Sequence, residues 1–246
     1  MNKEEVLRQI QGQLIVSCQG NASDGNPFCR PQDMLQMARA AQAGGCAGFR
    51  ANGPENIRAI KEAFPQKIMV GIWKVVSGDC EVYITPTMRE VEALHALGCE
   101  IIAVDGTQRK NCEGDMAPIR IGRIREKYPD QLIMADIATL EEAQCSLKAG
   151  ADIVSTTLSG YTESTRSRAA LGADFELIRQ IRQAFPGCLI NAEGRIWTRE
   201  EAKYALDCGA NMVTIGTAIT NPMAITRRFV DFLVKNRHKA AADGME

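Results

Sequence analysis

The sequence predicts a (β/α)8 barrel, the TIM-barrel fold, built as a single domain. Three observations lead to this prediction: the length, a repeated helix–glycine–strand unit, and polar residues where nearly every predicted strand ends. The chain has 246 residues, close to the roughly 250 residues typical of eight βα units. We expect the barrel to span residues 1–236 and residues 237–246 to form an unstructured tail.

The repeated unit consists of a helical pattern, a turn of small residues and a short apolar run. Clear examples are AAQAGGCAGFRAN, HALGCEIIAVDG, LKAGADIVSTT and LDCGANMVTIG. Glycine readily adopts the left-handed conformation that ends a helix, so we expect Gly44, Gly98, Gly150 and Gly209 to form the caps. The apolar runs are continuous rather than alternating, which is typical of parallel strands covered on both faces.

Eight such runs are predicted to be strands, and their starts lie about 20 to 36 residues apart, the span of one βα unit. They are Leu14–Cys18, Ala47–Arg50, Ile68–Ile72, Ile101–Asp105, Leu132–Asp136, Ile153–Thr156, Leu189–Glu193 and Met212–Gly216. Helical patterns fill the gaps, and Thr139 and Thr198 each begin a capping-box sequence. An unbroken series of this kind indicates a closed barrel. The alternative, a doubly wound open sheet, usually carries a G-x-G-x-x-G first turn, which the sequence lacks.

Composition excludes several classes of protein. The net charge of −1 provides no broad field for nucleic acid or an anionic membrane, and no run of about 18 apolar residues predicts a membrane span. The N-terminus lacks the apolar stretch of a signal peptide. The nine cysteines show no C-x-x-C spacing, as expected for unpaired thiols in a reducing cytosol. We therefore predict a cytoplasmic protein with neither a nucleic-acid nor a membrane partner.

Histidine is scarce, which disfavours a metal centre. Only His95, in a helical pattern, and His238, in the charged tail, occur in the chain. Because imidazole is the usual ligand in metal-dependent epimerases and zinc hydrolases, we expect no metal site built from histidine.

Polar side chains gather where the predicted strands end. Active sites of barrels lie at this end, and buried charges are costly unless they are paired or used. Any one of these residues alone could be a solvated loop charge, but their convergence predicts a functional cluster. Its members are Gln19, Arg50, Asn52, Lys74, Asp105, Arg109, Asp136, Glu193 and Arg195.

The last two strand ends predict a phosphate site. Gly194 and Arg195 follow the seventh strand, and Gly216 and Thr217 follow the eighth. Glycine lets backbone N–H groups approach an anion, and barrels frequently bind phosphate with these two loops. Arg195 could add a bidentate charged contact.

Eight segments, spread in order over nearly the whole chain, resemble the N-acetylmannosamine-6-phosphate 2-epimerases. They read LIVSCQ, GFRAN, GIWK, VYITPT, IIAVDGTQR, TTLSGYT, AEGR and VTIGTAIT. The resemblance implies an isomerase that interconverts N-acetylmannosamine 6-phosphate and N-acetylglucosamine 6-phosphate, a step in sialic acid breakdown. Inverting C2 requires a C–H bond to be broken beside the C1 aldehyde of the open-chain sugar and remade on the other face. This enolate chemistry requires no cofactor.

The resemblance also implies roles for individual residues. Lys74 and Glu193 match the catalytic lysine and glutamate of that family. Further residues are expected to bind or surround the substrate: Gln19, Arg50, Asn52, Asp105, Arg109, Asp136 and Tyr161. A nearby Glu193 carboxylate would keep Lys74 charged, whereas burial apart from Glu193 would let it act as the base, and the sequence does not choose between these cases.

Other interpretations remain open at this stage. Lys74 could form a Schiff base in a phosphosugar lyase, which borohydride trapping would reveal, or the chain could bind a sugar phosphate without turnover. The segments 20–30 and 163–174 could cover the site, and Arg166 or Arg168 could reach the phosphate or remain solvated. Apolar residues in ITRRFVDFLV, residues 225–234, could cover the barrel or a second copy in a homo-oligomer.

Overall fold

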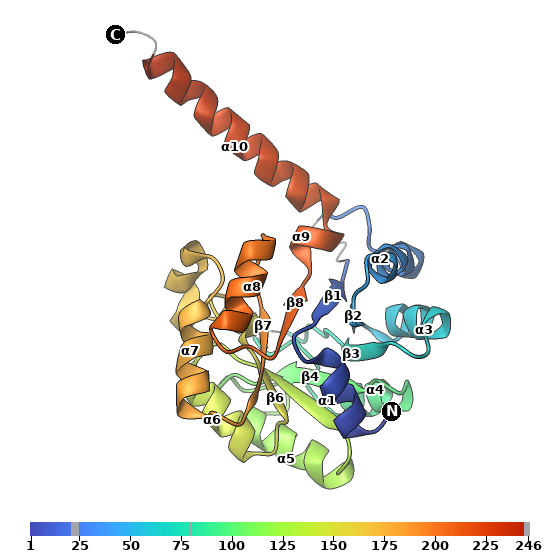
Figure 1. Ribbon diagram of the computed structural model, residues 1–246. Helices are drawn as coiled ribbons and strands as arrows, with labels where there is room; N and C mark the ends of the chain where they lie inside the picture. Colours follow the sequence, from blue (N-terminus) through green and yellow to red (C-terminus); the bar gives the residue numbers. More distant parts are fainter. Residues whose placement is uncertain (21–24, 79, 244–246) are drawn as a thin grey trace.

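Eight parallel strands form a closed barrel in the order β1-β2-β3-β4-β5-β6-β7-β8. The computed structural model describes residues 1–20, 25–78 and 80–243 (Figure 1). The barrel closes where β8 pairs with β1 and Leu14 lies opposite Val213. The predicted TIM-barrel fold is therefore confirmed.

The eight strands lie close to the predicted ranges. They are β1 Leu14–Cys18, β2 Gly48–Asn52, β3 Ile68–Ile72, β4 Ile101–Asp105, β5 Leu132–Asp136, β6 Ile153–Ser155, β7 Leu189–Glu193 and β8 Met212–Ile215. The second strand begins one residue later than predicted and continues to Asn52. The sixth is shorter, because a 3-10 helix begins at Thr156. The eighth ends one residue early, since Gly216 already caps a short helix.

Helices follow every strand and surround the barrel (Figure 1). They are α1 Lys3–Ile10, α2 Pro31–Ala43, α3 Pro54–Ala63, α4 Met88–Ala96, α5 Ala117–Lys127, α6 Leu140–Lys148, α7 Phe175–Ala184, α8 Arg199–Asp207, α9 Thr217–Thr220 and α10 Pro222–Asp243, with 3-10 helices η2 Thr156–Leu158 and η3 Glu163–Leu171. The predicted capping boxes form at α6 and α8, where Thr139 and Thr198 accept hydrogen bonds from backbone N–H groups at 3.2 and 3.1 Å.

Three of the four predicted glycine caps adopt the left-handed conformation: Gly98, Gly150 and Gly209 have φ angles of 70°, 108° and 111°. The expectation for Gly44 was wrong. Its φ of −77° is still right-handed, and the next residue, Gly45, turns the chain with a φ of 89°. The double glycine therefore shifts the end of the turn by one residue.

The core has two layers. Side chains that point outward from the strands pack against the helices, around residues such as Phe49, Ile102 and Ile190. The barrel interior is filled by a second cluster that includes Ile15 and Met212. Side chains of α1 belong to this inner cluster, so α1 closes the lower end of the barrel (Figure 1). The polar strand ends lie at the opposite, open end.

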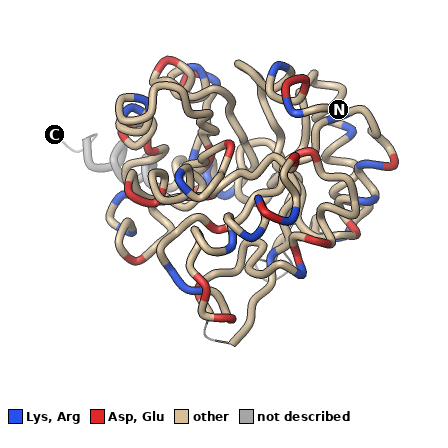
Figure 2. Tube along the Cα trace, turned by 90° about the horizontal axis from the view of Figure 1, so that it is seen from below, with Lys and Arg blue, Asp and Glu red and all other residues tan. Residues whose placement is uncertain are grey.

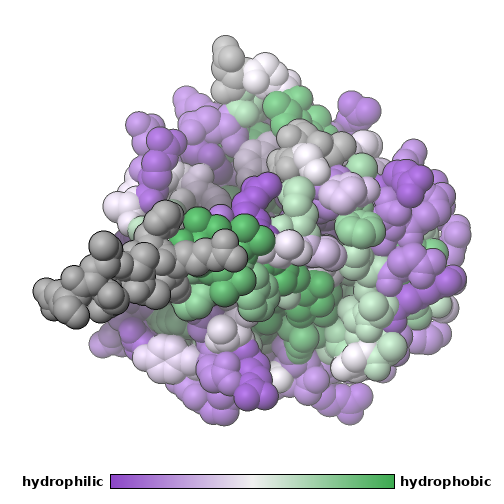
Figure 3. All heavy atoms as spheres, turned by 90° about the horizontal axis from the view of Figure 1, so that it is seen from above, coloured by the Kyte–Doolittle hydropathy of each residue, from purple (hydrophilic) through white to green (hydrophobic). Residues whose placement is uncertain are grey.

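Helix α10 leaves the barrel and extends away from it (Figure 1). Between residues 226 and 234 every side chain is exposed, including Phe229 at 68% and Leu233 at 62%. Beside the N-terminal end of α10, a groove of about 470 Å³ lies over the outer surface of the barrel. Its apolar lining comes from β1, β8, α8 and α9: Leu14, Ala202, Leu206, Val213, Ile215, Ala218 and Ile219. Figure 3 shows apolar residues, in green, gathered on the face seen from above.

The boundary of the expected C-terminal tail is still a prediction. Backbone helix is described as far as Asp243, within the range 237–246 that was expected to be unstructured. Residues 244–246 lie outside the described residues.

The charged residues and the cysteines are distributed as the composition of the chain suggests. Figure 2 shows acidic and basic residues interspersed along the chain. All nine cysteines lie within the described residues, and all are free thiols. Among the described residues, no helix combines the length and apolar character needed to cross a membrane.

Close packing between strands gives a test of the fold. A Cβ atom on Gly48 would lie 2.5 Å from the backbone oxygen of Ile68, which cannot move without distorting β3. We predict that Gly48→Ala lowers the free energy of unfolding by about 1–3 kcal/mol, as overpacking does. Gly122 lies inside α5 with nothing within 4 Å of an added Cβ, so Gly122→Ala is expected to raise it by about 0.5–1 kcal/mol. Urea denaturation measures both, and equal effects of the two substitutions would contradict the described packing.

Candidate active site

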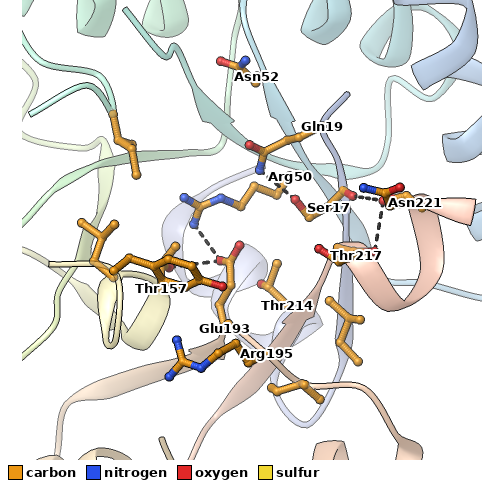
Figure 4. Close-up of a pocket in the computed structure, with 18 of the residues that line it drawn as sticks. Ser17, Gln19, Arg50, Asn52, Thr157, Glu193, Arg195, Thr214, Thr217 and Asn221 are labelled. Carbon is orange, nitrogen blue, oxygen red and sulfur yellow. Dashed lines mark hydrogen bonds and ion pairs between the residues drawn. The ribbon is translucent and has the colours of Figure 1, made fainter. Parts of the chain in front are cut away.

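A polar pocket of about 340 Å³ lies at the carboxyl ends of the strands (Figure 4). Most of the residues predicted from the sequence line it. These are Gln19, Arg50, Asn52, Lys74, Tyr161, Glu193, Gly194, Arg195, Gly216 and Thr217. Asp105, Arg109 and Asp136 were predicted with them but are not lining residues, and each of the three is paired with another charged side chain.

A buried ion triad forms the floor of the pocket. Arg50 projects from β2 and is 1% exposed. Its guanidinium donates to Asp136 on β5 through two nearly parallel contacts, Nη2 to Oδ2 at 2.6 Å and Nη1 to Oδ1 at 3.0 Å. Nη1 also donates to Oε2 of Glu193 on β7 at 2.8 Å. Figure 4 shows Arg50 directed toward Glu193. One cation is thus shared by two carboxylates across the barrel.

Burial changes the proton affinities within this triad. Burial opposes the charge of Arg50, but Asp136 and Glu193 outweigh it and raise the pKa of the guanidinium above its ordinary value. For Glu193, burial raises the pKa to about 7, and Asp136 contributes to the rise, while Arg50, Thr157 and Lys74 act in the opposite direction. Glu193 can therefore exist with or without its proton near neutral pH.

One oxygen of the Glu193 carboxylate is held by three donors. Oε2 accepts from Arg50 at 2.8 Å and from Thr157 and Asn191 at 3.3 Å each. The side chain is 11% exposed and lines the pocket, so the carboxyl group borders the volume in which a molecule can bind.

Lys74 follows β3 on the wall of the pocket. Its backbone N–H donates to Oδ1 of Asn52 at 2.8 Å, and the chain around it pairs in an antiparallel bridge with Ile84. Asn52 therefore orients the backbone that carries Lys74. Glu193 forms an ion pair with Arg50. The charge of Lys74 also lowers the pKa of Glu193, so the two groups act on the same pocket.

Asp105 and Arg109 form a separate pair beside the pocket. Arg109 lies four residues after Asp105 and folds back so that Nη2 donates to Oδ2 at 2.8 Å. Thr107 donates to the other carboxylate oxygen at 2.6 Å. Burial raises the pKa of Asp105 despite these contacts. The pair supports the loop after β4 and is not itself part of the lining.

The loops after β7 and β8 both contribute to the lining of the pocket. Gly194 and Arg195 both have positive φ angles, 106° and 58°, which turn the chain sharply after Glu193. Gly216 and Thr217 begin α9 on the neighbouring strand. Backbone groups of both loops therefore border the same volume.

The guanidinium of Arg195 is already occupied by protein groups. Nε donates to the carbonyl oxygen of Gly172 at 2.6 Å, Nη1 donates to that of Ser159, and the group lies 5.2 Å from the ring centre of Tyr161. Figure 4 shows the Arg195 guanidinium directed away from Thr217. The arginine thus fastens the segment 159–172 to the loop after β7. Within that segment, Arg168 pairs with Asp174 at 3.1 Å.

Several residues of the lining were not found from the sequence. They are Ser17, Tyr83, Thr157, Trp197, Thr214, Thr220 and Asn221, among others. Strand periodicity could have indicated Ser17, which lies two residues before Gln19 and accepts its hydrogen bond at 2.7 Å. Tyr83 belongs to the VYITPT motif, but no periodic pattern points to it.

Within the described residues, no three His, Cys, Asp or Glu side chains are grouped so that they could hold a metal ion. His95 has a structural environment, stacked on Tyr128 with ring centres 3.9 Å apart and bonded to Gln131 at 2.9 Å.

Comparison with known proteins places the chain in a family. The family model described as "Putative N-acetylmannosamine-6-phosphate epimerase" matches residues 34–235. A relative from Caldanaerobacter subterraneus subsp. tengcongensis, named "Putative N-acetylmannosamine-6-phosphate 2-epimerase", is 45% identical over 95% of this chain and 96% of its own. A relative of the same name from Clostridium perfringens is also 45% identical, over 93% of this chain and all of its own.

Solved structures agree with these relatives. The N-acetylmannosamine-6-phosphate 2-epimerase from Clostridium perfringens superimposes with a TM-score of 0.85 and 42% identity, covering 92% of this chain and 95% of that one. A thiamine phosphate pyrophosphorylase from Pyrococcus furiosus, at 15% identity and a TM-score of 0.59, covering 90% of this chain and 93% of that one, shares the fold alone. The chain therefore belongs to the N-acetylmannosamine-6-phosphate 2-epimerase family.

Proposed function

We propose that this protein interconverts N-acetylmannosamine 6-phosphate and N-acetylglucosamine 6-phosphate by removing and restoring the proton at C2. One observation supports this most directly: in this member of the family, Glu193 lies in the same pocket as Lys74 and has a pKa near 7. The reaction is an isomerisation through an enolate, so it consumes no cofactor.

Lys74 and Glu193 are proposed as the acid–base groups at C2. A reversible epimerisation needs groups that take up and release a proton at working pH, and a pKa near 7 suits Glu193 to both steps. Oε1 is the atom available for the transfer, since Oε2 is held by Arg50. The charges of Arg50 and Lys74 would stabilise the oxyanion that develops as C2 loses its proton.

The remaining site residues are proposed to bind and orient the sugar. Gln19, Asn52 and Tyr161 offer polar groups at the pocket wall, while Asp136 holds Arg50 in place. Asp105 and Arg109 are proposed to support the wall through the loop after β4 rather than to touch the sugar.

The phosphate is proposed to bind where the last two loops meet. The backbone groups of Gly194, Gly216 and Thr217 would bind it there. Arg195 would contribute mainly by fixing the loop, because its Nε and Nη1 already bond to carbonyl groups. A cytoplasmic location without a nucleic-acid partner remains our expectation.

We further propose that the protein is a homodimer in which α10 of each copy occupies the groove of the other. The groove covers the outside of β8 and β1, where the eighth helix of a barrel normally packs. The base of α10 is held in its outward direction, because Asn221 caps its first turn at 3.0 Å and Arg228 stacks 4.5 Å from the Trp197 ring. A second copy related by two-fold symmetry could fill the groove without breaking these contacts.

The first prediction concerns chemistry at C2. In D2O, the protein should convert N-acetylmannosamine 6-phosphate to the gluco epimer with deuterium at C2, as followed by proton NMR. Lys74→Ala and Glu193→Ala should each abolish this exchange while the proteins remain folded by circular dichroism. Exchange retained in either variant would remove that residue from the mechanism. An adduct trapped on Lys74 by borohydride would instead indicate Schiff-base chemistry.

The second prediction concerns the ionisation of Glu193. Its carboxyl resonance, labelled with ¹³C and assigned by its loss in Glu193→Gln, should titrate with a midpoint near pH 7. Thr157→Val removes a donor to the ionised form, so the midpoint should rise. Lys74→Ala removes a positive charge and should shift it in the same direction. A midpoint near the ordinary glutamate value of about 4.3 would contradict the described burial.

The third prediction concerns assembly. Phe229 and Leu233 lie one helical turn apart on α10, so the double change to glutamate should weaken packing in an apolar groove and yield monomers by light scattering. Ile119→Glu, at an exposed apolar residue on α5, serves as the matched control and should leave the dimer intact. A monomeric wild-type protein at micromolar concentration would refute the exchange of helices.

A further inference from the structure

Asn191 is a polar residue in the interior of the barrel, and the functions described so far do not use it. It lies in the middle of β7, two residues before Glu193, and is completely buried. Alternate strand residues share a face, so Asn191 and Glu193 both point inward. A buried amide is costly unless it is hydrogen-bonded, and this one has partners on both its oxygen and its nitrogen.

The contacts of Asn191 determine the orientation of its amide. Its Oδ1 accepts from the hydroxyl of Thr214 on β8 at 2.9 Å. Its Nδ2 donates to Oγ of Ser155 on β6 at 2.8 Å and to Oε2 of Glu193 at 3.3 Å. Exchanging oxygen and nitrogen would place the amide oxygen against the Glu193 carboxylate, so the present orientation is favoured.

The hydrogen bonds continue in one direction around the barrel. Ser155 accepts from Asn191 and can therefore donate to Thr157, 2.7 Å away. Thr157 in turn donates to Oδ1 of Asp136 at 2.7 Å and lies 3.3 Å from Glu193 Oε2. We call Thr214, Asn191, Ser155 and Thr157 the hydroxyl–amide belt. Its donors end on the two carboxylates that share Arg50.

We propose that Asn191 is a positioning residue, which together with Arg50 holds Oε2 of Glu193 and so directs Oε1 into the pocket. Arg50 donates to this oxygen from β2 and Thr157 from η2, and Asn191 adds a donor from the same strand as Glu193. Donors from three separate elements restrict rotation of the carboxylate about any one contact. This inference rests on the proposed function, in which Oε1 transfers the proton.

Several charged groups also face Glu193, and the test has to separate Asn191 from them. Arg50 approaches from β2, Asp136 from β5, and the charge of Lys74 from beyond β3. Thr157 contributes a neutral donor from η2. None of these bonds directly to Asn191, whose hydrogen-bond partners are Thr214, Ser155 and Glu193, with a weaker contact to the Met134 sulfur.

The experiment uses Asn191→Leu, which preserves the approximate shape and removes every donor. We expect kcat to fall about tenfold to a hundredfold, the range caused by a small misplacement of a reacting group, with KM nearly unchanged. The titration midpoint of the Glu193 carboxyl resonance should rise, because the ionised form loses a donor. Ser146→Ala is the matched control: it removes a fully buried hydroxyl that bonds to Gly106 at 3.4 Å, outside the belt and pocket, and should change neither quantity.

Ser155→Ala provides a second variant if Asn191→Leu does not fold. It leaves Asn191 without its acceptor on β6, so a smaller decrease in kcat is expected. Unchanged kcat and an unchanged midpoint in a folded Asn191→Leu or Ser155→Ala variant would overturn the positioning role. A change in KM with kcat unaltered would also overturn it. A wild-type protein without C2 exchange would refute the proposed function instead, and the titration arm would still report on the contact between Asn191 and Glu193.

Discussion

The arrangement of the site depends on one buried cation. Arg50 crosses the open end of the barrel from β2 and joins Asp136 on β5 to Glu193 on β7. Removing one partner of such a buried ion pair costs about 3–5 kcal/mol, because the remaining charge is left uncompensated. Two carboxylates this close to one guanidinium also compete for it. That competition, together with burial, leaves Glu193 with a pKa near 7 while Asp136 takes the bidentate contact.

The apolar core and the polar site occupy opposite ends of the barrel interior. The lower interior is apolar and closed by α1, whereas the upper interior changes to Asn191, Ser155, Thr214 and the ion triad within one or two residues along each strand. Asn191, Ser155 and Thr214 are tolerated at this depth because they bond to one another across adjacent strands, whereas Arg50 spans the barrel from β2 to β5 and β7. The parallel register makes this possible, since Ser155 lies opposite Asn191 and Glu193 opposite Thr214. The positions of the reactive groups are therefore fixed by the hydrogen-bonded sheet that carries them.

Much of this could be predicted from the sequence, for physical reasons. Continuous apolar runs between amphipathic helices can bury both faces only as parallel strands, so the fold followed from the pattern, with errors of one or two residues at Gly48 and Ser155. Strand-end charges pointed to Arg50, Lys74 and Glu193 because the strand ends of a barrel converge. Pairing was not predictable. Asp105 and Arg109 occupy strand-end positions like the others, yet they satisfy each other, and only their three-dimensional contacts show it.

The direction in which α10 leaves the barrel could not be predicted from the sequence either. An amphipathic segment shows that an apolar face will be covered, but the turn at Asn221 decides which surface covers it. Local backbone geometry also explains why Arg195 differs from the expected anion ligand. Its positive φ turns the side chain toward the carbonyl groups of Ser159 and Gly172, away from Thr217.

Trp197 has a consequence for how the protein would respond to its own concentration. Its ring supports Arg228 at the base of α10, and the residue borders both the polar pocket and the apolar groove. In the proposed dimer, a ligand that favours one position of this ring would, by thermodynamic reciprocity, alter the association of the subunits by the same factor by which association alters ligand affinity. The indole would then link occupancy of the pocket to self-association, so that dilution and substrate level would shift one equilibrium.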